Sequence, residues 1–164
     1  MLLQGSCHCG AVMFTVQSHT PYPFMHCYCS ICRKTQGGGG FSINIMGLYK
    51  SLKVTGKKHR KFFRASLDDP DRPGKKVLSS MKRYFCGRCG SALYGWDRQW
   101  AQWVYPFASA IDTRLPKAPQ RIHIMLNDAA PWVPVPKGKN DQHYPEYPKE
   151  SILGWHKKMK LYVK

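Results

Sequence analysis

Long apolar segments and acidic side chains are what this 164-residue sequence has least of. No stretch approaches the roughly 18–20 uninterrupted apolar residues that a membrane helix needs. Residues 1–5 lack the charged start and the apolar run of a secretory signal. We therefore expect a cytoplasmic protein that does not insert into a membrane.

Only nine residues are acidic, against 26 Lys and Arg, so the formal net charge is +17. With so few acids, and with no Ser-His-Asp or paired-carboxylate arrangement, catalysis by carboxylates is poorly supported. The positive charge instead predicts an anionic partner, such as nucleic acid, an acidic membrane surface or a small anionic substrate. The apolar content of 43% is high enough to build a folded core.

Nucleic acid is one interpretation of this charge. Thirteen basic residues lie between positions 50 and 88, and Phe62, Phe63, Tyr84 and Phe85 lie among them. Aromatic rings between basic residues can stack on bases. Because aromatic residues in strands more often belong to a core, we keep nucleic acid as an alternative partner and do not favour it.

Four consecutive glycines occupy positions 37–40. A phosphate-binding loop is excluded because no Gly-Lys-Ser/Thr follows them. Bare backbone could let a ligand approach closely and offer it amide groups. A flexible turn into a strand at Phe41 explains the run equally well.

The seven cysteines form three clusters: Cys7 and Cys9, then Cys27, Cys29 and Cys32, then Cys86 and Cys89. An odd number cannot pair completely within one chain. Short Cys-x-x-Cys units in an intracellular protein favour zinc, which binds four ligands in a tetrahedron. A redox role for Cys29 and Cys32 is less favoured because no βαβ pattern surrounds them.

Seven cysteines divide naturally into four plus three. The two outer pairs can close a structural four-thiolate site, whereas the three central cysteines leave one position open, as catalytic zinc sites do. Other groupings stay open, and His26 or His8 could supply a fourth ligand. In a strand, His8 would point away from the metal of its neighbours Cys7 and Cys9.

The remaining pattern is β-rich. Short aromatic or β-branched segments bounded by Gly, Pro, Asn or Asp predict strands at residues 11–16, 41–46, 61–65, 81–85, 92–96, 103–111 and 121–126. We predict one short helix after Cys29 and another at 151–161, with Ser151 as its N-cap. Residues 67–76 are polar and rich in turn formers, which predicts an exposed loop. We place a zinc-binding β domain at 1–135 and a Pro/Lys-rich connector with the C-terminal helix at 136–164.

With these motifs identified, the chain resembles the family of glutathione-dependent formaldehyde-activating enzymes, which includes centromere protein V. Residues 5–12 (GSCHCGAV) resemble the opening G-x-C-x-C-G-x-V of the family. Residues 26–34 (HCYCSICRK), with Gly37, are similar to its C-x-C-x-x-C-R segment, and residues 84–91 (YFCGRCGS) to its second cysteine pair. All seven family cysteines have a counterpart.

The resemblance implies a zinc-bound β-tent fold with two zinc ions per chain. The structural zinc would bind Cys7, Cys9, Cys86 and Cys89, and the catalytic zinc would bind Cys27, Cys29 and Cys32. The implied activity is that of a carbon–sulfur lyase, which forms S-hydroxymethylglutathione from glutathione and formaldehyde or cleaves it.

A zinc ion with three thiolate ligands forms a site of charge −1, which lowers the pKa of bound water less than a site with neutral histidine ligands does. Such a site is better suited to binding a soft sulfur ligand. Our hypothesis is that a substrate thiol binds there and attacks an aldehyde. Glutathione is anionic, so Arg33, Lys34 and Arg88 are candidate partners for its charge. We predict that Arg33 and Lys34, together with the backbone of Gly37 and Gly38, bind the substrate. The alternative is a non-catalytic zinc module that binds protein or nucleic acid.

Overall fold

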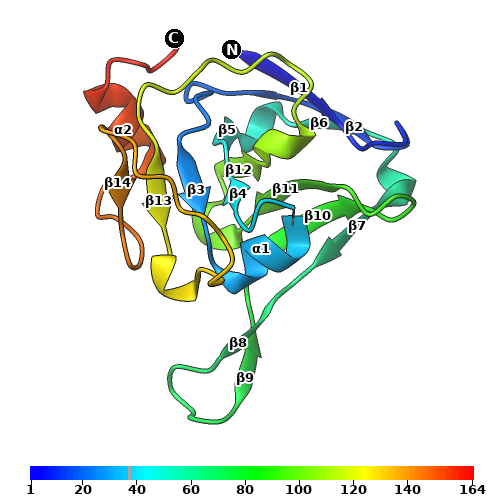
Figure 1. Ribbon diagram of the computed structural model, residues 1–164. Helices are drawn as coiled ribbons and strands as arrows, with labels where there is room; N and C mark the ends of the chain where they lie inside the picture. The colour runs from blue at the N-terminus through cyan, green and yellow to red at the C-terminus, as the bar shows by residue number, and fades with distance from the viewer. Residues whose placement is uncertain (37) are drawn as a thin grey trace.

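The computed structural model describes residues 1–36 and 38–164, and shows a mainly β protein with two short α-helices (Figure 1). The prediction of short strands and a short C-terminal helix is confirmed. In the described part of the chain, no helix is long and apolar enough to cross a membrane. Gly37 lies outside the described residues, so the prediction made for it is not addressed by the structure.

The first sheet has three antiparallel strands in the order β1 (Leu2–Ser6), β2 (Met13–Gln17) and β6 (Lys53–Thr55). Its inner face buries alternate residues, including Leu3, Phe14 and Val16, as the two-residue period of a strand requires. Strand β2 corresponds to the prediction at 11–16, whereas β1 and β6 were not predicted.

The second sheet lies at the centre of the molecule and contains five antiparallel strands. Their order is β5 (Gly47–Leu48), β12 (Trp103–Pro106), β11 (Ala92–Trp96), β10 (Lys82–Cys86) and β7 (Arg60–Phe63). The last four match predicted strands. The prediction at 103–111 was too long, because a 3-10 helix at Ala108–Ala110 follows β12.

The third sheet has the order β14 (Gln142–His143), β13 (Ile122–Ile124), β3 (Met25–Cys27) and β4 (Ser42–Ile43). Strand β13 pairs in parallel with both β14 and β3, unlike the antiparallel strands of the first two sheets. Strands β3 and β14 were not predicted, because two or three residues are too few to show an alternating pattern. This sheet positions Cys27 at the end of β3, immediately before α1 (Ser30–Gln36).

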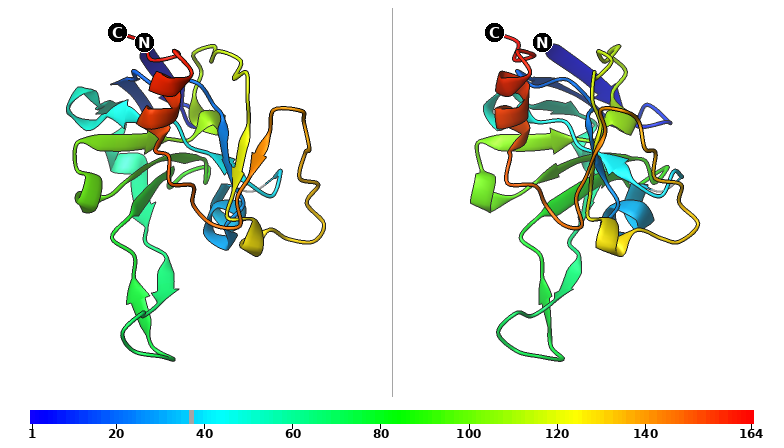
Figure 2. Two further views of the ribbon diagram at one scale, coloured as in Figure 1. Left: turned by 90° about the vertical axis from the view of Figure 1, so that its left-hand side faces the viewer. Right: turned by 60° about the vertical axis from the view of Figure 1, so that its left-hand side comes forward.

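A hairpin of β8 (Ser66–Asp68) and β9 (Lys76–Leu78) projects away from the rest of the molecule (Figures 1 and 2). The prediction of a loop at 67–76 was therefore wrong at its ends, which form strands, and right about exposure. The hairpin exposes Leu67, Val77 and Leu78. Mostly outward-facing side chains weaken the alternation that identifies a strand in sequence.

The C-terminal helix α2 (Ile152–Lys158) is anchored to the third sheet (Figure 2). Ser151 caps it by accepting a hydrogen bond from the Gly154 amide at 3.0 Å, as predicted. Trp155 is buried and stacks on Phe24, with the ring centroids 3.8 Å apart. The indole of Trp155 also donates to the side-chain oxygen of Gln120 at 2.9 Å. These contacts hold residues 147–153 against the body of the protein.

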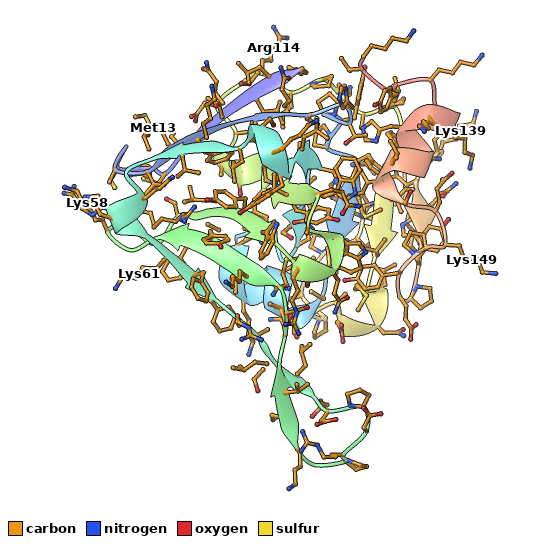
Figure 3. All side chains as sticks on the ribbon, turned by 180° about the vertical axis from the view of Figure 1, so that it is seen from behind. Met13, Lys58, Lys61, Arg114, Lys139 and Lys149 are labelled. Carbon is orange, nitrogen blue, oxygen red and sulfur yellow. The ribbon has the colours of Figure 1, made fainter. Side chains whose placement is uncertain are left out.

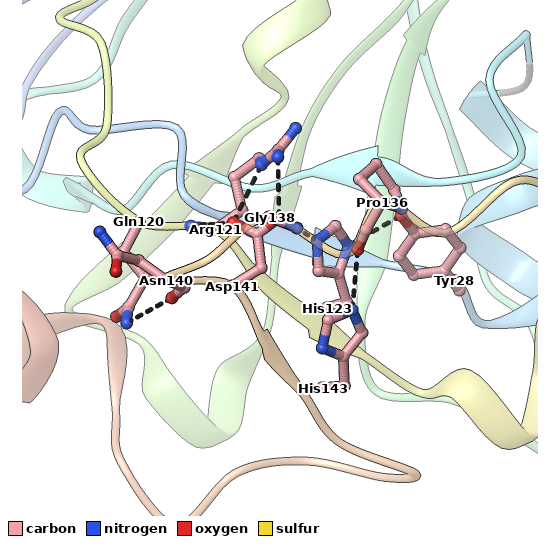
Figure 4. A network of polar contacts seen from close by, with 9 residues as sticks. All are labelled: Tyr28, Gln120, Arg121, His123, Pro136, Gly138, Asn140, Asp141 and His143. Atoms are coloured by element: carbon pink, nitrogen blue, oxygen red, sulfur yellow. Dashed lines mark hydrogen bonds and ion pairs between the residues drawn. The ribbon is translucent and has the colours of Figure 1, made fainter.

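One carboxylate ties the start of β13 to the connector before β14 (Figure 4). Asp141 accepts hydrogen bonds from the Arg121 guanidinium at 2.7 and 3.2 Å and from the Gly138 amide at 2.9 Å. The bonds from Arg121 lower the pKa of Asp141 from 3.8 to about 2. His123, which is fully buried, lies beside this pair and contacts the Tyr28 hydroxyl through Nδ1 at 2.9 Å.

We expect Asp141→Asn to lower the free energy of unfolding at neutral pH by about 1–2 kcal/mol, because the hydrogen bonds to a charged acceptor are lost. A carboxyl with a depressed pKa stabilises the fold above pH 3.8, and the contribution disappears as the pH falls through about 2. Denaturant unfolding of both proteins should therefore show a difference that is constant above pH 5 and shrinks below pH 4. A difference that grows on acidification would contradict this assignment.

Candidate metal centres and the adjoining cavity

Four cysteines meet where two tight turns face each other. Cys7 and Cys9 follow β1, Cys86 ends β10, and Cys89 lies in the turn before β11. Their sulfurs lie within 4.8 Å of one another. The Cys7–Cys9 and Cys9–Cys86 sulfur distances are 3.6 and 3.9 Å. A zinc ion with bonds of about 2.3 Å places tetrahedral sulfurs about 3.8 Å apart, so the four cysteines fit it.

Each turn is closed by a glycine in the left-handed region. Gly10 has a φ of 70° and donates to the Cys7 carbonyl at 2.9 Å. Gly90 has a φ of 76° and donates to the Cys86 carbonyl at 2.8 Å. Other residues are strained in this conformation, which explains why both cysteine pairs are followed by glycine. Because four thiolates fill a tetrahedral site, this arrangement is typical of a structural metal.

The other three cysteines also converge. Cys27, Cys29 and Cys32 place their sulfurs within 4.8 Å of one another at the junction of β3 and α1. Hydrogen bonds from Cys27 and Cys32 lower the pKa of Cys29 to about 2. The same contacts, together with burial, raise the pKa of Cys27. Three crowded sulfurs that share their protons in this way are a donor set suited to a soft or borderline cation.

The two histidines considered as extra ligands lie elsewhere. In the described part of the chain, the groups of three or more candidate ligand residues are these two cysteine groups, and neither contains a histidine. His8 is exposed in its turn. His26 stacks on Phe41 at 4.7 Å and meets His123 edge-on at 5.2 Å. The structure thus groups the cysteines as four and three.

The three-cysteine group opens into a cavity of about 510 Å³. The cavity lies between the second and third sheets and is closed on another side by residues 147–153. Its lining is mostly aromatic and aliphatic. The lining side chains other than the cysteines include Met25, Asn44, Met46, Met81, Arg83, Trp100, Trp103, Tyr105, Phe107, Ile124, Tyr147, Lys149, Glu150, Ser151, Ile152 and Leu153.

Arg83 and Lys149 are the cationic side chains in this lining. Arg83 Nη1 is buried and has no hydrogen-bond partner among the described residues. A buried guanidinium nitrogen without a partner is costly, so Arg83 is a candidate for binding an anionic group in the cavity. Burial raises the pKa of Tyr105 to about 12, so its hydroxyl keeps its proton at neutral pH.

The residues predicted to bind substrate lie outside this lining. Arg33 and Lys34 belong to α1, where Lys34 is exposed. Gly38 is exposed in the turn after α1, and Gly37 lies outside the described residues. Neither Arg33, Lys34 nor Gly38 is among the described residues that line the cavity. Within the glycine run, Gly40 has a φ of 79°, and a Cβ there would collide with Val133, so that position serves a packed turn.

Our reasoning from the sequence missed Arg83, because strand alternation alone does not show which face of a sheet will meet the three cysteines. Alternation along β10 places Lys82 and Arg83 on opposite faces of the second sheet. Lys82 lies over the Phe62 ring at 5.0 Å, on the face away from the cavity. Arg83 therefore points to the other face, toward the cavity that the three-cysteine group lines.

Comparisons with known proteins agree on one family. A family model described as glutathione-dependent formaldehyde-activating enzyme matches residues 2–128. A protein of Halomonas elongata that carries the same family name is 48% identical over 161 residues, which is 98% of each chain. A solved structure of a Rhodobacter sphaeroides protein aligns with a TM-score of 0.50 and 22% identity, covering 69% of this chain and 91% of that one. This last likeness concerns the fold alone.

Proposed function

Because this chain belongs to the family of glutathione-dependent formaldehyde-activating enzymes, we propose that it joins a thiol to an aldehyde, or cleaves their adduct, in the cavity above the three cysteines. The observation that carries the proposal is the opening of Cys27, Cys29 and Cys32 into a cavity that also contains the unpartnered Arg83. The reaction class is that of a carbon–sulfur lyase. The thiol is an anionic molecule of the glutathione type.

We assign two zinc ions per chain to this function. Cys7, Cys9, Cys86 and Cys89 would hold a structural ion, and the three remaining cysteines would hold the second. A zinc ion bound by three thiolates stabilises the deprotonated form of a further thiol. None of the seven cysteines forms a disulfide, and thiolate ligands to zinc suit a reducing compartment such as the cytoplasm.

In the forward direction, the substrate thiolate attacks the carbonyl carbon, and a sulfur–carbon bond forms. The π electrons of the carbonyl move to its oxygen, which takes up the proton that the thiol gave up. Atoms and charge balance without an oxidant or reductant, and cleavage reverses the same steps. The protonated hydroxyl of Tyr105 is a donor in the cavity for the developing oxygen charge.

Arg83 binds the carboxylate of the thiol in this scheme. We expect Arg83→Met to raise the KM for glutathione about 10–100-fold, because a charge-assisted hydrogen bond to a carboxylate is lost. Lys82→Met is the matched control, since it removes the same charge from the other face of the same strand. Steady-state kinetics of both variants, and of Arg33→Met, distinguish the two proposed anion sites. Equal KM values for Arg83→Met and Lys82→Met would remove Arg83 from substrate binding.

One observation favours a second function. Phe62 and Phe63 were expected in the core, but they are 52% and 44% exposed. Lys82 lies over Phe62, and Lys58 and Lys61 point outward at the same end of the second sheet (Figure 3). Such a surface can stack and neutralise single-stranded nucleic acid. Binding that weakens steeply with salt, and that is lost in Phe62→Ala, would support this alternative.

A further inference from the structure

We infer that the adduct handled in the cavity carries a bulky apolar group, preferably an aromatic ring, in place of the hydroxymethyl group that formaldehyde would provide. This inference rests on the proposed function and specifies its substrate class. It comes from the size of the cavity, the chemistry of its walls and the segment that closes it.

The cavity is much larger than the reaction centre requires. Its volume of about 510 Å³ lies within the range of roughly 300–1,000 Å³ that holds drug-sized ligands. Formaldehyde adds a single carbon and its oxygen to the thiol. The glutathione-type thiol occupies part of the cavity, and a larger aldehyde substituent would fill space beside it that the formaldehyde adduct leaves empty.

The walls are chemically selective. Trp100, Trp103, Tyr105, Phe107 and Tyr147 contribute aromatic surface to the lining. Met25, Met46 and Met81 add flexible thioether side chains, which pack well against aromatic rings.

The charged groups of the lining are few. Arg83 and Lys149 are cationic and Glu150 is anionic, while Asn44, Ser151 and the hydroxyls of Tyr105 and Tyr147 add neutral hydrogen-bond partners. These groups suit the charged and peptide parts of a glutathione-like molecule. A peptide group placed against the remaining apolar wall would lose its hydrogen bonds to water, which is unfavourable. The apolar wall is therefore available to a substituent of matching character.

The closing wall belongs to a part of the chain that the family model does not match. The family model ends at residue 128, whereas residues 147–153 line the cavity. The cap at Ser151 and the stack of Trp155 on Phe24 hold this wall in place. The size limit of the cavity is thus set by the C-terminal segment. The reaction is the same addition of a thiol to an aldehyde, and only the group attached to the carbonyl carbon is larger.

Binding of two stable glutathione thioethers to the metal-loaded protein tests the inference. We expect S-benzylglutathione to bind at least about tenfold more tightly than S-methylglutathione in isothermal titration calorimetry, because the ring is buried against Trp103 and Tyr105. Trp103→Leu should reduce this ratio several-fold. Trp100→Ala removes a half-exposed ring from the same lining and should reduce the ratio even if the first variant folds poorly.

Trp132→Ala is the control, since Trp132 is 63% exposed and does not line the cavity in the described part of the chain. It should keep the wild-type ratio. Equal binding of the two thioethers, or tighter binding of the methyl compound, would overturn the inference.

Turnover separates a failure of this inference from a failure of the proposed function. Exchange of glutathione with formaldehyde and with phenylacetaldehyde is followed by NMR. A larger acceleration over the uncatalysed exchange for phenylacetaldehyde than for formaldehyde supports the inference. A larger acceleration for formaldehyde overturns the inference while the proposed function stands. If neither exchange is accelerated, the proposed function fails, and the inference fails with it even where the benzyl compound binds more tightly.

Discussion

Cys29→Ser is expected to reduce exchange between thiol and aldehyde by about 1000-fold or more while the fold is retained. Cys29 is one of the three sulfurs that converge beside the cavity and would hold the second ion. Losing one of three thiolates removes a metal ligand, and metal ions contribute several kcal/mol to stabilising charge in such reactions. Exchange spectroscopy with glutathione and an aldehyde measures the loss.

Metal content and stability accompany this measurement. The variant should contain one zinc per chain in place of two, and its thermal unfolding should stay close to that of the wild type. Ser30→Ala, an exposed neighbour on α1, is the control and should keep both ions and the activity. Retained turnover in Cys29→Ser would remove this cysteine from the mechanism.

Cys86→Ser is expected to have the largest effect on stability. Cys86 is fully buried and joins the turn after β1 to the turn between β10 and β11. Structural zinc sites contribute roughly 10 kcal/mol of apparent binding free energy. This is comparable to the whole free energy of unfolding of a typical domain. We therefore expect the variant to lose its cooperative unfolding transition at 37 °C, as measured by circular dichroism and calorimetry.

Together, the two cysteine variants test the division into a structural and a catalytic site. If the four-cysteine site is structural and the three-cysteine site is catalytic, Cys86→Ser unfolds the protein and Cys29→Ser does not. A Cys86→Ser protein with a wild-type melting temperature would show that the four-thiolate group does not hold the fold together. Treatment with a chelator should release the ion of the three-cysteine site first, since three protein ligands leave one coordination position open to the chelator and four do not.

Much of the central sheet could be predicted from local patterns. The segment 92–96 coincides with β11, and the predicted strand at 81–85 differs from β10 by one residue at each end. These strands carry aromatic or β-branched residues and end at glycines or turns, so their pattern is clear. Strands β3 and β14 have three and two residues, and their pairing depends on neighbours distant in sequence. No local pattern identifies them.

The candidate site likewise has features that the sequence determines and features that depend on the tertiary structure. Cys29 and Cys32 are three residues apart, so a single helical turn brings their sulfurs together whatever the rest of the fold does. The sequence also contained the glycines that close the other two cysteine turns. By itself, therefore, it determined the donor atoms, their local geometry and the family.

The tertiary structure alone decided which distant groups meet. Cys9 and Cys86 are 77 residues apart, and spacing left their grouping open until sheet packing joined the two turns. The same packing turned Arg83 toward the three cysteines and left Arg33 and Lys34 outside the cavity lining, in the part of the chain that the structure describes. Residues 147–153 close the cavity only because Trp155 anchors α2 on Phe24. Contacts between distant segments depend on how sheets pack, and local sequence patterns carry no information about that packing.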